Sequence, residues 1–342
     1  MAVKPLHPCR RAGRLHRFLL TLLSALSAAG CSVNPTLRLE QITSARFPLH
    51  LDAVPFFAQT DYQCGPAALA GVLGASGVDT GPDELSPQVY LPGRRGSLQP
   101  ELLAATRRAG RVPYLLDPAP ANLIAQLEAA RPVLVFQNVR TPSFPQWHYA
   151  VLTGVDAATN RVYLNSGTNQ SMDMPAGAFL RTWNWAERWA MVALRPGELP
   201  AQPDRQRYMQ AVTDFEAVAG TPRATPAWRA AMRRWPRDAR PYLALGNAAY
   251  AGGDLLVAID YYRRGLQVRP GEPVLSNNLA ALLGELGCPA SGLLLLRPVA
   301  EGLEGNSSWG PVIDDTLAEL TAAGRSEAGY CALLEWQSTI GS

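Results

Sequence analysis

The segment QTDYQCGPAAL, residues 59–69, places a single cysteine at the start of an apolar stretch. Gly65 and Pro66 follow Cys64, and proline is tolerated in the first turn of a helix, where its missing N–H would have no partner. Alanine, leucine and valine then continue to Ser76, which predicts a helix that begins at Cys64. The positive end of a helix dipole favours a thiolate, the reactive form of cysteine. We therefore predict that Cys64 is a nucleophile.

A nucleophile of this kind needs donors for the oxyanion that forms on its substrate. Gln59 lies five residues before Cys64, and its side-chain amide can donate together with the backbone N–H of Cys64. Gly65 lets a substrate approach the backbone closely because it has no side chain. These features predict an acyl-transfer site that uses Gln59 as an oxyanion donor.

The nucleophile also needs a base and a group that orients the base. His148 begins a predicted strand over residues 147–155, and residues 161–164 form a second strand after a turn at 156–160. The second strand ends at Asn165, which we expect to fold back beside His148 and fix its tautomer. Asp156, in the turn, is the alternative orienting residue.

These motifs together resemble a known family. Gln59, the CGPAA start at Cys64, the HYAV strand at His148 and the VYLN strand that ends at Asn165 are similar to the bacteriocin-processing peptidases. Those are papain-like enzymes that cut leader peptides after a double glycine. The resemblance covers about residues 50–196 and implies Cys64 as nucleophile, Gln59 as oxyanion donor, His148 as base and Asn165 as orienting residue. The family usually has aspartate at the last position.

Classic members of that family are fused to an export ATPase. No Gly-rich phosphate loop that ends in Lys-Ser or Lys-Thr is present in the sequence, which argues against such coupling and against a leader-peptide substrate.

The N-terminus has the pattern of a targeting segment. Basic residues precede an apolar run from Phe18 to Ala29, which is too short to span a bilayer as an ordinary helix. Ala28, Ala29 and Gly30 before Cys31 resemble the lipobox of bacterial lipoproteins, which implies lipidation of Cys31 and, with Ser32 next, sorting to the outer membrane facing the periplasm. A plain secretory signal is the alternative. Both readings predict export.

Loss of this leader would leave few residues for chemistry. His50 and His148 are the remaining histidines, and His50 precedes the nucleophile, against the order of the family. Cys288 and Cys331 both lie in the second half of the chain, and export favours a disulfide between them; two separate buried thiols are the alternative. No spacing typical of zinc ligands is present, and cysteine chemistry of this kind needs no cofactor.

The second half of the chain predicts helices only. Tyr242, Leu245, Gly246, Ala258, Tyr262, Gly265 and Pro270 fall on the spacing of a tetratricopeptide repeat. The small residues would let two antiparallel helices approach closely, with tyrosines between them. Such stacks bind peptides or partner proteins on a concave face. An unrelated helical bundle is the alternative.

The predicted organisation is an α+β papain-like cysteine peptidase domain followed by an all-α tetratricopeptide-like domain. The segments are a signal peptide at 1–31, a tether at 32–48, the peptidase domain at 49–196, a Pro-rich linker at 197–206 and the helical domain at 207–342. Within the peptidase domain, Trp183, Trp185 and Trp189 are expected in the core or the wall of the cleft.

The charge balance excludes one class of partner. The net charge of +3 comes largely from Lys4 and the arginines of the first seventeen residues, so a nucleic-acid partner is not expected. The predicted function is hydrolysis of a peptide or amide bond in a peptide or protein substrate, on a chain held to the membrane by lipid. The alternatives are acyl transfer to an amine and a binding protein that has lost catalysis.

Overall fold

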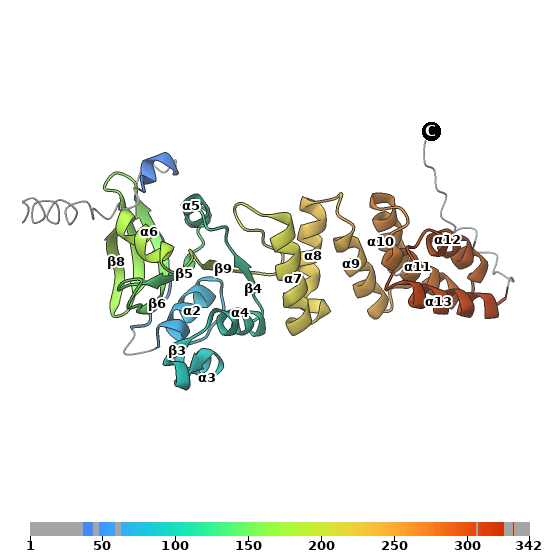
Figure 1. The fold of residues 1–342 in the computed structure, drawn as a ribbon, viewed down its shortest axis with the longest axis horizontal. Coiled ribbons are helices and arrows are strands. Elements are labelled where there is room, and N and C mark those ends of the chain that lie inside the picture. The colour runs from blue at the N-terminus through green and yellow to red at the C-terminus, as the bar shows by residue number, and fades with distance from the viewer. Residues whose placement is uncertain (1–36, 44–47, 59–62, 306, 325–330, 332–342) are drawn as a thin grey trace, which may run out of the picture.

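The computed structural model describes residues 37–43, 48–58, 63–305, 307–324 and 331. Figure 1 shows a domain with a sheet followed by a row of helices. Within the described residues, no helix is long and apolar enough to cross a membrane.

The first domain is built around a seven-stranded antiparallel sheet of order β4-β9-β5-β6-β7-β8, with β1 also paired to β6. The strands of this sheet are β1 (Leu49–His50), β4 (Val112–Leu115), β5 (Val133–Asn138), β6 (Trp147–Asp156), β7 (Arg161–Ser166), β8 (Asn169–Pro175) and β9 (Ala190–Leu194). A small separate ladder joins β2 (Tyr90–Leu91) to β3 (Gly96–Ser97).

Helices cover both faces of the sheet. They are α2 (Cys64–Ala75), α3 (Pro82–Val89), α4 (Gln99–Arg108), α5 (Pro120–Glu128) and α6 (Ala176–Asn184), with short 3₁₀ turns η1 (Leu39–Gln41) and η2 (Pro92–Arg94). Leu69 and Leu73 of α2 pack against Tyr149 and Val151 of β6. Ala150 and Leu152 belong instead to a second buried cluster with residues of α5 and α6. This alternation follows from the pleat of a strand, which sends successive side chains to opposite faces.

Most elements of this domain agree with the sequence prediction. The predicted helix from Cys64 and the predicted strand pair after His148 correspond to α2, β6 and β7. Among the longer elements, α3, α6 and β8 were not predicted, and neither were the two-residue strands β1, β2 and β3 or the two 3₁₀ turns. Asn169–Pro175 is rich in polar residues and half-exposed, so it lacks the apolar alternation by which a strand is recognised.

The helical region has seven helices in the described residues, which pair along the row as neighbours (Figure 1). They are α7 (Arg205–Ala219), α8 (Thr221–Arg234), α9 (Arg240–Ala251), α10 (Leu255–Val268), α11 (Pro273–Glu285), α12 (Pro289–Glu301) and α13 (Gly310–Ala322). The close approach predicted at Gly246 is present, since a Cβ there would collide with the ring of Tyr262. Ala258 is fully buried between the same two helices.

The first helices of the helical region also belong to the core of the sheet domain. Tyr208, Val212 and Phe215 of α7 are fully buried, in one cluster with Val112 of β4 and Leu194 of β9. The hydroxyl of Tyr114 accepts a hydrogen bond of 3.0 Å from the backbone N–H of Asp204, just before α7. The Pro-rich linker therefore does not separate two independent cores.

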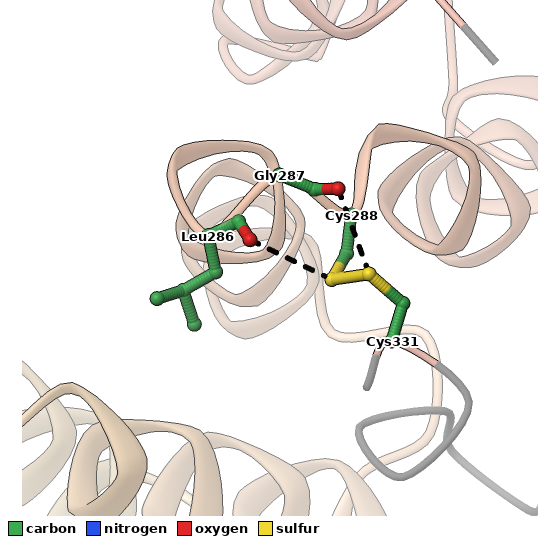
Figure 2. The surroundings of a disulfide bond; sticks show 4 residues. All are labelled: Leu286, Gly287, Cys288 and Cys331. Atoms are coloured by element: carbon green, nitrogen blue, oxygen red, sulfur yellow. Dashed lines mark hydrogen bonds between the residues drawn. A yellow bond between two sulfur atoms is a disulfide. The ribbon is translucent and has the colours of Figure 1, made fainter. Parts of the chain in front are cut away.

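At the far end of the helical region, Cys288 and Cys331 form a disulfide with a Cα–Cα distance of 5.5 Å (Figure 2). Cys288 is fully buried in the cluster that α10 and α11 share. The cross-link ties a residue beyond α13 back to the start of α12, across a sequence separation of 43 residues.

Candidate active site

Cys64 lies at the N-terminus of α2, at the edge of a cleft of about 1010 Å³. Its thiol is free and partly buried. The next residue, Gly65, is in close contact with Ser97 of β3, and a Cβ at this position would overlap the serine side chain. Gly65 is thus required by packing as well as by access to the backbone. Gln59, the predicted oxyanion donor, and Cys31, the predicted lipidation site, lie outside the described residues.

His148 lies near the start of β6 and lines the same cleft as Cys64. The backbone N–H of Tyr149, the residue that follows it, donates a hydrogen bond to the sulfur of Cys64. The hydroxyl of Tyr149 in turn donates to the carbonyl of Ser97, at 3.2 Å. The strand that carries the histidine is therefore attached directly to the start of the nucleophile helix.

The structure places Ser166, and not Asn165, against the imidazole. The Oγ of Ser166 lies 2.9 Å from Nε2 of His148. Asn165 pairs with Val151 in the ladder and accepts a hydrogen bond of 3.0 Å from the N–H of Ser171. Because neighbouring residues on a strand point to opposite faces, only one of the two can reach the histidine. The predicted contact between Asn165 and His148 is therefore wrong.

The alternative orienting residue is also excluded by position. Asp156 accepts hydrogen bonds from Thr159 and from the N–H of Ala158 in the β6–β7 turn. These bonds lower its pKa, the hydroxyl of Thr159 contributing most. It makes no contact with His148 in the hydrogen-bond network of the described residues.

A β-bulge explains the error at Asn165. Next to the turn, Asp156 pairs with Arg161 and Gly154 pairs with Tyr163. If this register continued along the two strands, Asn165 would lie opposite Leu152, on the same face of the sheet as His148. Thr153 is an extra residue in the ladder, so Leu152 pairs with Leu164 and every later residue of β7 changes face. The signal in the sequence is Gly154, where the carbonyl of Leu49 approaches so closely that no Cβ would fit.

His50 is not part of this cleft. Its Nδ1 lies 2.6 Å from Oδ1 of Asp52, and its Nε2 contacts the hydroxyl of Ser171 on β8. His50 lies on β1, and its ring partners are Asp52 and Ser171.

The cleft favours uncharged forms of both candidate catalytic groups. Burial raises the pKa of the Cys64 thiol, and the N–H of Tyr149 offsets this only in part. Burial also lowers the pKa of His148. The Ser166 hydroxyl carries no charge that would stabilise an imidazolium. Burial is the main cause of both shifts, so the cleft favours a neutral thiol and a neutral imidazole over a preformed thiolate–imidazolium pair.

This arrangement still suits general-base chemistry. When the hydroxyl of Ser166 accepts a hydrogen bond from Nε2–H, Nδ1 remains free to take a proton. A thiol that loses its proton to Nδ1 as it attacks a carbonyl needs no ion pair in the resting state. In the described residues, no group of three or more histidine, cysteine or acidic side chains is placed to hold a metal ion.

Comparison with protein families finds a match in the sheet domain. Residues 51–191 match the Peptidase_C39 like family. The match includes Cys64, His148 and Ser166 and leaves the helical region outside. With this match, the predicted fold class is confirmed: a papain-like α+β domain is followed by an all-α helical region.

Solved structures with similarity to part of the chain include the following two. One is a putative C39-like peptidase from Bacillus anthracis, with 17% identity over 43% of this chain and 97% of that chain and a TM-score of 0.36. Another is the TPR2B-domain:pHsp70 complex of yeast Sti1, with 20% identity over 34% of this chain and 96% of that chain and a TM-score of 0.31. No curated protein matches the chain.

Proposed function

We propose that the chain is an exported, lipid-anchored cysteine peptidase of the C39-like type, in which Cys64 attacks a peptide or amide bond. The observation that carries this proposal is that a free cysteine at a helix N-terminus and a histidine held by Ser166 line one cleft. The match of residues 51–191 to the Peptidase_C39 like family supports it.

The reaction follows from these groups. The sulfur of Cys64 attacks the carbonyl carbon while Nδ1 of His148 takes the thiol proton, and the C–N bond breaks as that proton passes to the leaving amine. The product is a thioester on Cys64. Water, deprotonated by the same imidazole, then attacks the thioester and releases the acid and the thiol.

The test measures hydrolysis of fluorescently labelled casein by the mature chain and by the variants Cys64→Ala and His148→Ala. We expect measurable hydrolysis in the parent and its loss in both variants. An equal residual rate in the parent and in Cys64→Ala would overturn the proposal. A run with added amine distinguishes hydrolysis from acyl transfer, because the amine then appears in the mass of the product.

A second candidate is a binding protein that has lost catalysis. The observation that favours it is the uncharged environment of His148, where Ser166 occupies the orienting position and burial lowers the pKa of the imidazole. This candidate predicts that casein remains intact and that Cys64 is alkylated only at alkaline pH. The alkylation rate of Cys64 against pH therefore separates the two candidates.

The lipid anchor belongs to the same proposal and rests on residues 18–31 of the sequence. Labelling of cells with radioactive palmitate tests it. We expect label on the chain in the membrane fraction and its loss in Cys31→Ser. Label that persists in this variant would contradict lipidation at Cys31.

A further inference from the structure

A second cavity of about 640 Å³ adjoins the candidate active site. Three residues, Gln99, Phe136 and Trp147, line both this cavity and the cleft that contains Cys64 and His148. The two spaces therefore meet at these side chains. We call the second space the α7 pocket, because Gln210, Ala211 and Asp214 of α7 form one of its walls.

Aromatic rings connect the two spaces. The ring of Trp147 stacks on Phe136, with centroids 5.3 Å apart and planes at 17°. Phe136 packs on Tyr149 at 4.5 Å, and Tyr149 meets the edge of Trp189 at 6.0 Å. Trp147 nevertheless remains 52% exposed. A row of rings thus runs from the candidate nucleophile into the α7 pocket and leaves apolar surface uncovered along it.

The remaining walls of the α7 pocket are also largely apolar. Leu115 at the end of β4 is 40% exposed, although it is aliphatic, and it lines the pocket with Trp185. Trp183, which is close in sequence to Trp185 and Trp189, is fully buried in the core and does not line the pocket. A ligand that covers Leu115 and Trp147 removes apolar surface from water, which is the main source of affinity in such pockets.

The arginines that line the α7 pocket are already bound within the protein. Arg107 donates to Asp214 at 2.8 Å, and this pair ties α4 to α7. Arg207 pairs with Asp117, and Arg188 donates to Asn184 and to the carbonyl of Pro118. Arg107 and Arg207 are thus each paired with a carboxylate, and the charge of Arg188, whose partners are neutral, is balanced by the neighbouring Glu187 in the pocket lining. The charged side chains therefore cancel, and the chemistry of the pocket suits an uncharged, apolar group.

We propose that the α7 pocket binds a large apolar side chain of the peptide substrate, on one side of the bond that Cys64 attacks. This inference rests on the proposed peptidase function and goes beyond it. It assigns a specificity subsite to residues that include the first helix of the helical region. The helical region would then select substrates through direct contact with the peptide, in addition to any partner bound farther along the row of helices.

The experiment measures binding rather than cleavage, so that it does not depend on catalysis. The Cys64→Ala chain is titrated with fluorescent Gly-Ser peptides in which a single Leu or Trp occupies each position in turn. We expect about tenfold tighter binding when the apolar residue occupies one particular position, which corresponds to the burial of most of one such side chain.

Two variants fill or polarise the α7 pocket, and each has a matched control. Gln210→Trp places a large ring in the pocket from the exposed face of α7, and Gln267→Trp makes the same change on the exposed face of α10. Leu115→Asp adds a charge to the pocket wall, and Leu294→Asp does so at a site that is 74% exposed. We expect the two pocket variants to abolish the positional preference and the two controls to retain it.

Several results would overturn the inference. These are the absence of any positional preference, a preference that Gln210→Trp and Leu115→Asp leave intact, or equal loss in the controls. The alkylation rate of Cys64, measured in the otherwise unchanged Gln210→Trp chain and in the parent, separates the proposed subsite from the proposed nucleophile. If Gln210→Trp loses the positional preference while its Cys64 reacts as in the parent, the effect lies in the α7 pocket and supports the subsite. If the unsubstituted pocket shows no positional preference although Cys64 of the parent is reactive, the subsite is wrong and the proposed nucleophile stands.

Discussion

Ser166 determines how the histidine of this site behaves. A hydroxyl at hydrogen-bond distance from Nε2 holds the imidazole in place, but it offers no negative charge to an imidazolium. A carboxylate at the same position would favour the charged ring by direct attraction. The serine therefore orients the ring as a carboxylate would, but it does not stabilise the charged form. Burial consequently lowers the pKa of His148 with no opposing charge from Ser166.

Ser166→Asp is expected to activate the site. The new carboxylate should raise the pKa of His148 and, through the imidazolium, lower the pKa of the Cys64 thiol. We expect alkylation of Cys64 by iodoacetamide near pH 6.5 to become about tenfold faster or more, which corresponds to a pKa change of about one unit. The measurement is the alkylation rate as a function of pH.

Asn165→Asp is the matched control for that experiment. It introduces the same charge one residue earlier, on the opposite face of β7. It should leave the rate near that of the parent. A large acceleration in Asn165→Asp, with none in Ser166→Asp, would show that Asn165 is the orienting residue after all.

The lowered pKa of His148 also predicts a dependence of stability on pH. Its folded value lies below the unfolded value of about 6.5, so the unfolded chain binds more protons in mild acid. The stabilising contribution of the neutral ring is complete above about pH 6.5 and is lost as the pH falls through the folded value. We expect the melting temperature to fall less between pH 7.5 and 5 in His148→Gln than in the parent. An equal fall in both proteins would contradict the depressed pKa.

The candidate nucleophile and base were predictable from the sequence, whereas their orienting residue was not. Cys64 and His148 begin elements with strong local signals, an apolar helix and an apolar strand. The position of Ser166 depends on one extra residue at Thr153, which inverts the face of every residue beyond it. Gly154 only hints at this irregularity, because a glycine in a strand indicates a bulge or a close approach without saying which.

At the scale of elements, helix pairs were predicted where small residues repeat. Gly246 of α9 lies against the ring of Tyr262 on α10, and Gly265 of α10 lies against Leu275 of α11. These contacts join neighbouring helices along the row, and their spacing is visible in the sequence. By contrast, α3 and α6 carry no repeat, and they were missed for lack of a comparable signal.

Gly246→Ala tests this packing. The added methyl group would overlap the Tyr262 ring, which is itself fully buried, so the two helices must separate. Overpacking of this kind costs about 1–3 kcal/mol. We expect a lower melting temperature of the helical region by circular dichroism.

Gly310→Ala is the control for the change at Gly246. It makes the same substitution at the start of α13, where nothing apart from its chain neighbours lies within 4 Å of the new Cβ. Its melting temperature should stay at the parent value or rise slightly, since alanine is the better helix former. A similar fall of the melting temperature in both variants would mean that replacement of any helical glycine has this effect, and that the contact with Tyr262 is not its cause.

At the scale of the whole molecule, the sheet domain and the first helical pair form one core. Tyr208, Val212 and Phe215 are fully buried among residues of β4 and β9. The last strand, β9, ends at Leu194 and α7 begins at Arg205, on either side of the change of composition near residue 197. This change of composition does not mark a boundary of folding, because burial across the junction depends on contacts that no local pattern encodes.

A pair of fragments tests this shared core. A fragment of residues 32–203 lacks α7 and α8, and a fragment of residues 32–238 retains both. Three fully buried side chains, each worth about 1.5–3 kcal/mol, are lost from the shorter fragment. The total, about 5 kcal/mol or more, is comparable with the entire stability of an ordinary domain.

We therefore expect the shorter fragment to unfold at a much lower temperature than the longer one, or to expose enough apolar surface to bind the dye ANS at room temperature. Calorimetry of both fragments measures this, and the longer fragment serves as the control for truncation itself. Equal melting temperatures would mean that α7 does not contribute to the stability of the sheet domain. A large difference would mean that the helical region cannot detach from the candidate active site without unfolding it, which is the rigidity that a specificity wall built on α7 requires.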